Sequence, residues 1–151
     1  MKNTNKYLSY TAAWARIKQA NEQGFHFEAV TICESIISDR LLSYLAGTKP
    51  GYKPKKKTSF GKLIAEWGKS DPAGLPAPDK DGLSLPEAVD LWRGERNKVV
   101  HGLVKSEPGK PTEDVQDFLA LAEKTAKEGA SLARKVCDWH KAQLCASKKI
   151  L

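Results

Sequence analysis

The sequence predicts an all-α protein: a mainly antiparallel helical bundle of about five helices. Apolar residues recur three and four positions apart along several long segments, short polar or Pro/Gly-rich stretches separate these segments, and no segment reads as a convincing strand. A chain of 151 residues can bury one continuous core, so we expect a single domain over 1–151. The expected helices span residues 5–21, 25–45, 60–69, 85–101 and 113–144.

The first two expected helices should form an antiparallel pair. Gly24 ends the first and leaves a short connection to the second, which Gly47 and Pro50 end with residues typical of a helix C-terminus. The first helix should place Leu8, Ala12, Ala15 and Ala20 near one side, with Trp14 and Ile17 beside them.

The third and fourth expected helices have clear N-terminal signals. Thr58 or Ser59 can cap the third helix, whose apolar residues Phe60, Leu63, Ile64 and Trp67 follow the i, i+3, i+4, i+7 spacing. Ser84 and Glu87 form a capping-box pattern around Pro86 at the start of the fourth helix, and Gly102 can end it.

The fifth expected helix is the longest. Thr112 should cap it, with Glu113 and Asp114 in a first turn where acidic groups favour the helix dipole. Its apolar side should comprise Val115, Phe118, Leu119, Ala122, Ala126, Ala133, Val136 and Cys137.

One arginine lies in the middle of an apolar helix face. At about 100° per residue, Arg96 falls within the face formed by Leu85, Ala88, Val89, Trp92, Val99, Val100 and Leu103. A buried guanidinium is costly unless an acid pairs with it, and Glu34 lies inside the apolar sector of the second helix. We therefore expect an Arg96–Glu34 ion pair, which either organises the core alone or also supports a site.

Three polar residues line one flank of the same helix. Arg93, Asn97 and His101 recur every four residues at the margin of the apolar face, where a cleft or a subunit contact can form. Histidine exchanges a proton near neutral pH, and arginine presents a planar cation suited to phosphate. A single histidine is more often structural than catalytic, and the R-x4-H spacing alone is a weak pattern.

Composition narrows the classes of function. No segment approaches the roughly 20 apolar residues of a membrane span, and the start of the chain lacks the apolar region of a signal peptide, so we expect a cytoplasmic protein without membrane contact. Three cysteines without framework spacing indicate free thiols, and Cys137 with His140 is too small a set for zinc. We expect no metal and no cofactor. The net charge of +7 modestly favours an anionic partner.

The stretch from Glu95 to Gly102, ERNKVVHG, resembles the R-x4–6-H signature of the HEPN superfamily. The resemblance extends to the helical bundle, to a motif near the end of the penultimate long helix, and to an acidic residue in the second helix. Only these eight residues are specific.

The resemblance implies a metal-independent RNA endonuclease that works as a homodimer. In that superfamily the 2′-hydroxyl of the RNA attacks the adjacent phosphate and leaves a 2′,3′-cyclic phosphate. His101 would then transfer the proton, Arg96 would bind phosphate, Asn97 would orient the site and Glu34 would hold Arg96. Such domains recur as toxins and antiviral defence effectors, which implies an antitoxin or another defence-system protein as a partner.

One position departs from the pattern. Members paired with a nucleotidyltransferase antitoxin often carry tyrosine two residues after the histidine, where this chain has Leu103. Other members are inactive and serve as dimerisation or RNA-binding modules. A third interpretation of the sequence is a helical adaptor that binds protein partners. Under this interpretation only packing would explain the position of Arg96.

The lysine-rich loop before the third helix offers a second contact for RNA. Lys55, Lys56 and Lys57 can bind phosphates, and Tyr52 can stack on a base. A solvated loop without a ligand explains so short a cluster equally well.

Overall fold

The computed structural model describes residues 3–53, 55–112 and 114–149. Within these ranges the chain forms five helices and no strand, which confirms the expected all-α bundle. The helices are α1 (Thr4–Gln23), α2 (His26–Thr48), α3 (Phe60–Lys69), α4 (Leu85–Gly102) and α5 (Val115–Lys149). Each described helix is too short or too polar to span a bilayer.

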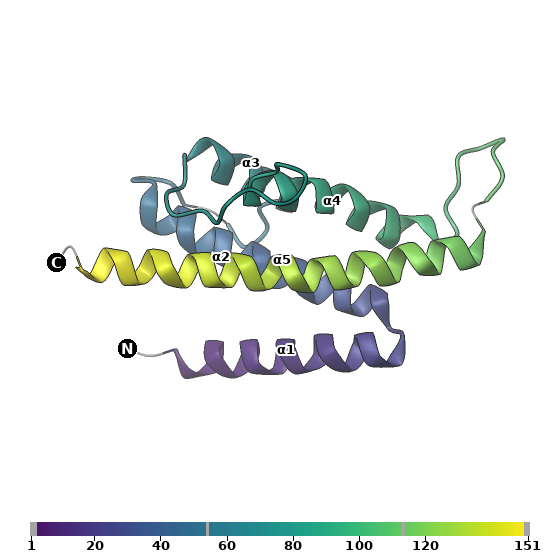
Figure 1. The fold of residues 1–151 in the computed structure, drawn as a ribbon, viewed down its shortest axis with the longest axis horizontal. Coiled ribbons are helices and arrows are strands. Elements are labelled where there is room, and N and C mark those ends of the chain that lie inside the picture. Colours follow the sequence, from purple (N-terminus) through teal and green to yellow (C-terminus); the bar gives the residue numbers. More distant parts are fainter. Residues whose placement is uncertain (1–2, 54, 113, 150–151) are drawn as a thin grey trace.

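Helix α5 runs the length of the molecule and organises the other helices (Figure 1). Helix α1 lies on one side of it, and α3 and α4 lie on the other. The pair α1–α2 is antiparallel, as expected, and so is α4–α5, whereas α2 and α5 run in the same direction (Figure 1). Phe27 and Phe118 stack near the starts of α2 and α5, and Tyr44 packs against Trp139 near their ends.

Tryptophans connect the helices on the α3–α4 side of the core. Trp92 of α4 is 2% exposed, packs edge-on against Phe60 of α3, and donates a hydrogen bond from Nε1 to the carbonyl oxygen of Thr125 in α5 (2.9 Å). A Cβ on Gly129 would lie 2.6 Å from the Trp92 ring, so this glycine is what allows α5 to approach the indole. The middle of α4 is therefore fixed against both neighbours.

The apolar side predicted for α1 is wrong in part. Leu8, Ala12 and Ala15 are exposed, whereas Ile17 and Ala20 are buried and Trp14 is half-buried. The apolar residues of α1 are spread over all sides of the helix, so the sequence alone does not identify the side that faces α2. The third helix behaves as expected, with Ser59 as its N-cap and all four predicted apolar residues buried.

At α4 and α5 the helix ends confirm one predicted cap and correct two others. Glu87 donates its backbone N–H to Ser84 Oγ, and its side chain accepts from the backbone N–H of Ser84 (2.8 Å), which completes the capping box. Asp114, not Thr112, caps α5 by accepting from two backbone N–H groups of its first turn, because the helix starts at Val115 and Asp114 is the residue directly before it. Glu113 lies outside the described residues.

The end of α4 also differs from the prediction. The helix continues through Gly102, and Leu103 follows in a right-handed conformation (φ −61°, ψ −42°) rather than a left-handed glycine cap. Gly102 has another role: a Cβ there would lie 3.0 Å from the ring of Phe118. The missing side chain lets α4 end directly against α5.

Candidate active site

The predicted ion pair between α4 and α2 is present. Arg96 Nε contacts Glu34 Oε2, and the Arg96 and Glu34 side chains are 24% and 18% exposed, respectively. The buried Nε–H bond is not aligned with the carboxylate, so the contact is an ion pair rather than a directed hydrogen bond. The pair is only partly screened from solvent, and Arg96 lies at the margin of the core rather than in its centre.

Arg96 also fixes its neighbour in sequence. Its Nη1 donates a hydrogen bond to Oδ1 of Asn97 (2.7 Å). A guanidinium can only donate, so the amide oxygen of Asn97 faces it and the amide nitrogen remains available to donate elsewhere. Glu34, Arg96 and Asn97 thus form a chain of contacts from α2 to the surface of α4.

That surface forms one wall of a cleft of about 400 Å³. Asn97 and His101, one helical turn apart, lie on the wall that α4 provides, and the connection to α5 provides the rest. His101 is exposed. The lining residues are Asn97, Lys98, His101, Gly102, Lys105, Ser106, Glu107 and Pro108.

The other predicted site residues lie outside the cleft. Arg93 pairs with Asp90 (3.0 Å), and its guanidinium lies against Gly61 of α3. Arg96 faces α2 and Asn97 and does not line the cleft. The structure therefore brings together Asn97 and His101, with Arg96 one contact away.

The lysine loop is a separate surface. Lys55, Lys56 and Lys57 are exposed and precede α3, whose first turn packs on α4 at Trp92 and Arg93. None of the three lines the cleft. Their proposed contact with RNA stays a prediction.

Sequence reasoning missed two cations of the cleft, Lys98 and Lys105. Lys98 lies one turn before His101 on α4, whereas Lys105 belongs to the connection that follows the helix. The prediction considered the polar flank of the fourth helix alone and not the connection beside it. Lys98 also pairs with Glu95 (3.0 Å), and Glu107 of the cleft pairs with Lys110 (2.6 Å).

Apolar side chains beside the cleft are more exposed than predicted. Val100 of α4, Leu103 directly after that helix, and Val115 and Leu119 of α5 were expected on core faces, but each is at least 40% exposed. Val104 is 81% exposed. The end of α4 and the start of α5 lie at the extremity of the bundle, where fewer helices cover them (Figure 1). We call these five residues the apolar end patch.

The remaining nucleophilic and titratable groups lie away from the cleft. Cys33 is buried, and burial raises the pKa of its thiol to about 12, so the thiol stays protonated and unreactive. Burial and the nearby Arg40 lower the pKa of His140. Among the described residues, no group of three or more histidine, cysteine, aspartate or glutamate side chains is arranged to hold a metal ion.

No protein family, curated protein or solved structure matches this chain. We therefore infer function from the cleft's own residues.

Proposed function

We propose that the protein is a metal-independent RNA endonuclease of the HEPN type, acting in the cytoplasm as a toxin or defence effector. One observation carries the proposal. His101 and Asn97 lie one turn apart on the wall of one cleft, and an ordered arginine hydrogen-bonds to Asn97. A proton-transfer group and a neutral donor then face a space that Lys98 and Lys105 make electropositive.

The reaction assigns a task to each group. His101 takes the proton from the 2′-hydroxyl, the 2′-oxygen bonds to phosphorus, and the bond from phosphorus to the 5′-oxygen breaks. The 5′-oxygen takes up a proton, which leaves a 2′,3′-cyclic phosphate and a 5′-hydroxyl. Asn97 donates its amide N–H to a phosphate oxygen, the lysines stabilise the charge that develops there, and Arg96 holds Asn97 in position from outside the cleft.

A second copy of the chain supplies the proton for the leaving oxygen. A cleft with one histidine offers a base or an acid, and the reaction needs both. The apolar end patch adjoins the cleft, so a two-fold dimer through this patch brings a second His101 close to the first. Sedimentation at micromolar concentration should show a dimer, and Val104→Glu should convert it to a monomer and abolish cleavage.

Cleavage of RNA in EDTA tests the proposal. Wild type should cleave single-stranded RNA to cyclic-phosphate ends, and His101→Ala should lose about 10²- to 10⁴-fold in rate, the usual contribution of a positioned acid or base. Lys80→Ala is a control, because Lys80 is exposed, lies outside the cleft and contacts none of its residues through an ion pair. Equal cleavage by wild type and a folded His101→Ala protein would refute the mechanism. RNA binding and dimerisation without cleavage would instead identify a non-catalytic module.

A further inference from the structure

A second concave surface lies between α1 and α5. It is a groove of about 710 Å³, larger than the cleft beside His101. Trp14 and Ile17 of α1 and Ala130 of α5 form its apolar part. It exists because α1 packs mainly on α2 and makes few contacts with α5.

The charged residues of the groove are mostly cationic. Lys18 of α1 and Arg134 and Lys135 of α5 line it, against one carboxylate, Glu22. None of these three cations has an ion-pair partner among the residues that the structure describes. Elsewhere on α5, by contrast, Lys127 pairs with Glu123 (2.8 Å). The groove therefore concentrates positive charge that the protein does not neutralise.

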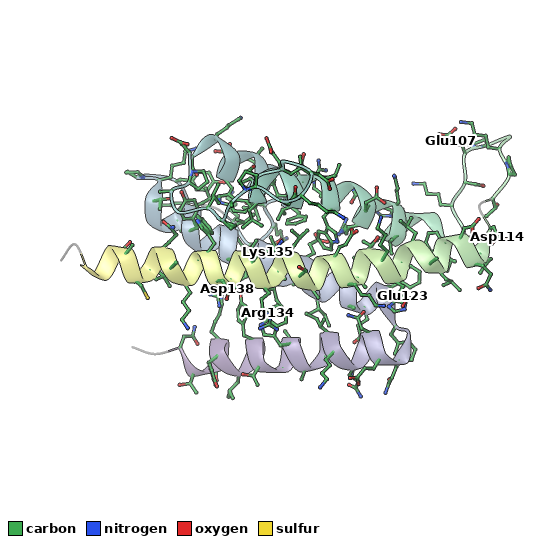
Figure 2. The ribbon with its side chains drawn as sticks, in the orientation of Figure 1. Glu107, Asp114, Glu123, Arg134, Lys135 and Asp138 are labelled. Atoms are coloured by element: carbon green, nitrogen blue, oxygen red, sulfur yellow. The ribbon has the colours of Figure 1, made fainter. Side chains whose placement is uncertain are left out.

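One of these cations is held in place by an aromatic ring. The guanidinium carbon of Arg134 lies 4.1 Å from the centroid of the Trp14 indole, and Figure 2 shows Arg134 between α5 and α1. Stacking orders the guanidinium and leaves its N–H groups free to donate. A planar ordered cation beside an indole suits a ligand that carries both phosphates and flat rings.

The groove is separate from the cleft. Helix α4 packs on the side of α5 that carries Phe118 and Gly129. Arg134 lies about 160° around the helix from Phe118 and roughly 24 Å along it, at about 100° and 1.5 Å per residue. Consistent with this, α1 and α4 lie on opposite sides of α5 in Figure 1.

We propose that the groove between α1 and α5 binds single-stranded RNA, with Lys18 and Lys135 on phosphates and the Trp14–Arg134 pair against a base. Double-stranded RNA is disfavoured because its stacked bases cannot reach the indole. An acidic peptide would neutralise the lysines but offers no ring for Trp14. The choice of RNA as ligand rests on the proposed function, whereas binding in the groove does not require cleavage.

Fluorescence anisotropy with a short labelled 2′-O-methyl RNA strand tests this proposal, because such a strand lacks the attacking hydroxyl and cannot be cleaved. The combined variant Lys18→Ala, Arg134→Ala, Lys135→Ala should bind about tenfold or more weakly. Its plot of log K against log salt should be shallower by about 1.4, since about 0.7 is lost for each phosphate contact on a single strand and the variant loses the two lysine contacts. Glu22→Gln should strengthen binding.

The control removes the same charge elsewhere. Lys80, Lys124 and Lys127 are exposed and lie outside both the groove and the cleft, and replacing all three by alanine should change affinity less than about twofold. Equal weakening by both triple variants, or equal displacement of the strand by poly-glutamate, would overturn the groove as a specific site.

The same assay separates this proposal from the proposed function. His101→Ala should bind the uncleavable strand as wild type does. If Lys105→Ala abolishes binding and the groove variant retains it, the RNA lies in the cleft and the groove proposal fails while the nuclease proposal stands. If the groove variant loses binding and wild type cleaves no RNA, the nuclease proposal fails and the groove proposal stands.

Discussion

The two halves of α4 differ in capping, burial and charge. From Leu85 to Trp92 the helix begins with a complete capping box, buries its apolar side and hydrogen-bonds through Trp92 to α5. From Arg96 to Gly102 it buries one aliphatic residue, Val99, and presents amide, imidazole and ammonium groups to a cleft. A single helix thus combines a rigid anchor with a polar, accessible end, and an anchored first half can hold His101 in place without burying it.

Trp92→Ala should have the largest effect on stability, about 3–5 kcal/mol, because it leaves a cavity in the core and removes the hydrogen bond to the Thr125 carbonyl. Urea denaturation measures it. Leu91→Ala, at an adjacent exposed position, should cost about 0.5 kcal/mol or less. Similar losses for the two variants would contradict the anchoring role of the first half.

Glu34→Ala should cost about 1–3 kcal/mol, less than the 3–5 kcal/mol of a fully buried pair, since both partners keep some contact with solvent. It should also slow cleavage, because Arg96 no longer holds Asn97 in place. The double variant Glu34→Leu, Arg96→Met should recover stability but not activity. Recovery of both would show that the pair serves packing only.

Ser84→Ala should cost about 1 kcal/mol, the usual value of an N-cap, and leave cleavage unchanged. Ser84 lies roughly 25 Å from His101 along the helix at 1.5 Å per residue. Ser9→Ala, in the middle of α1, is the matched control and should change stability by less than about 0.5 kcal/mol. A loss of cleavage in Ser84→Ala at a temperature where it stays folded would show that the two halves are coupled.

His101→Ala should have the smallest effect on stability, within about 0.5 kcal/mol, although we expect the largest loss of activity from it. The side chain is exposed and lies on the wall of the cleft rather than in the core. Thermal unfolding measures this. Destabilisation by more than about 2 kcal/mol would assign His101 a structural role instead.

The features that sequence predicted well depend on residues close to one another in the chain. The capping box at Ser84 and the buried face of α3 follow from local spacing. The Arg96–Glu34 pair was also predictable, although its partners come from different helices, because each charge was misplaced on its own apolar face. Burying either charge alone would be unfavourable, and pairing the two charges offsets both costs.

The features that sequence missed depend on where the bundle ends. Val100, Leu103, Val115 and Leu119 have apolar spacing, but no other helix reaches far enough to cover them. Lys98 and Lys105 become cleft residues only because the connection to α5 folds back beside α4. Neither the exposure of these apolar residues nor the cleft position of the lysines can be predicted from helical periodicity. Periodicity shows which residues share a helix face, but not which segment packs against that face.

The dominance of α5 in the core has a consequence for the order of folding during synthesis. Phe118, Thr125 and Trp139 all belong to α5, which the ribosome makes last of the five helices. They stack on Phe27, accept the hydrogen bond of Trp92 Nε1 and donate to the Ala73 carbonyl, respectively. Until α5 emerges, the faces of α2 and α4 that it covers have no counterpart, so a nascent chain ending before Val115 exposes apolar surface. Folding of the described part is therefore late and cooperative rather than helix by helix, and a stalled ribosome within α5 should yield a chain that chaperones or proteases recognise.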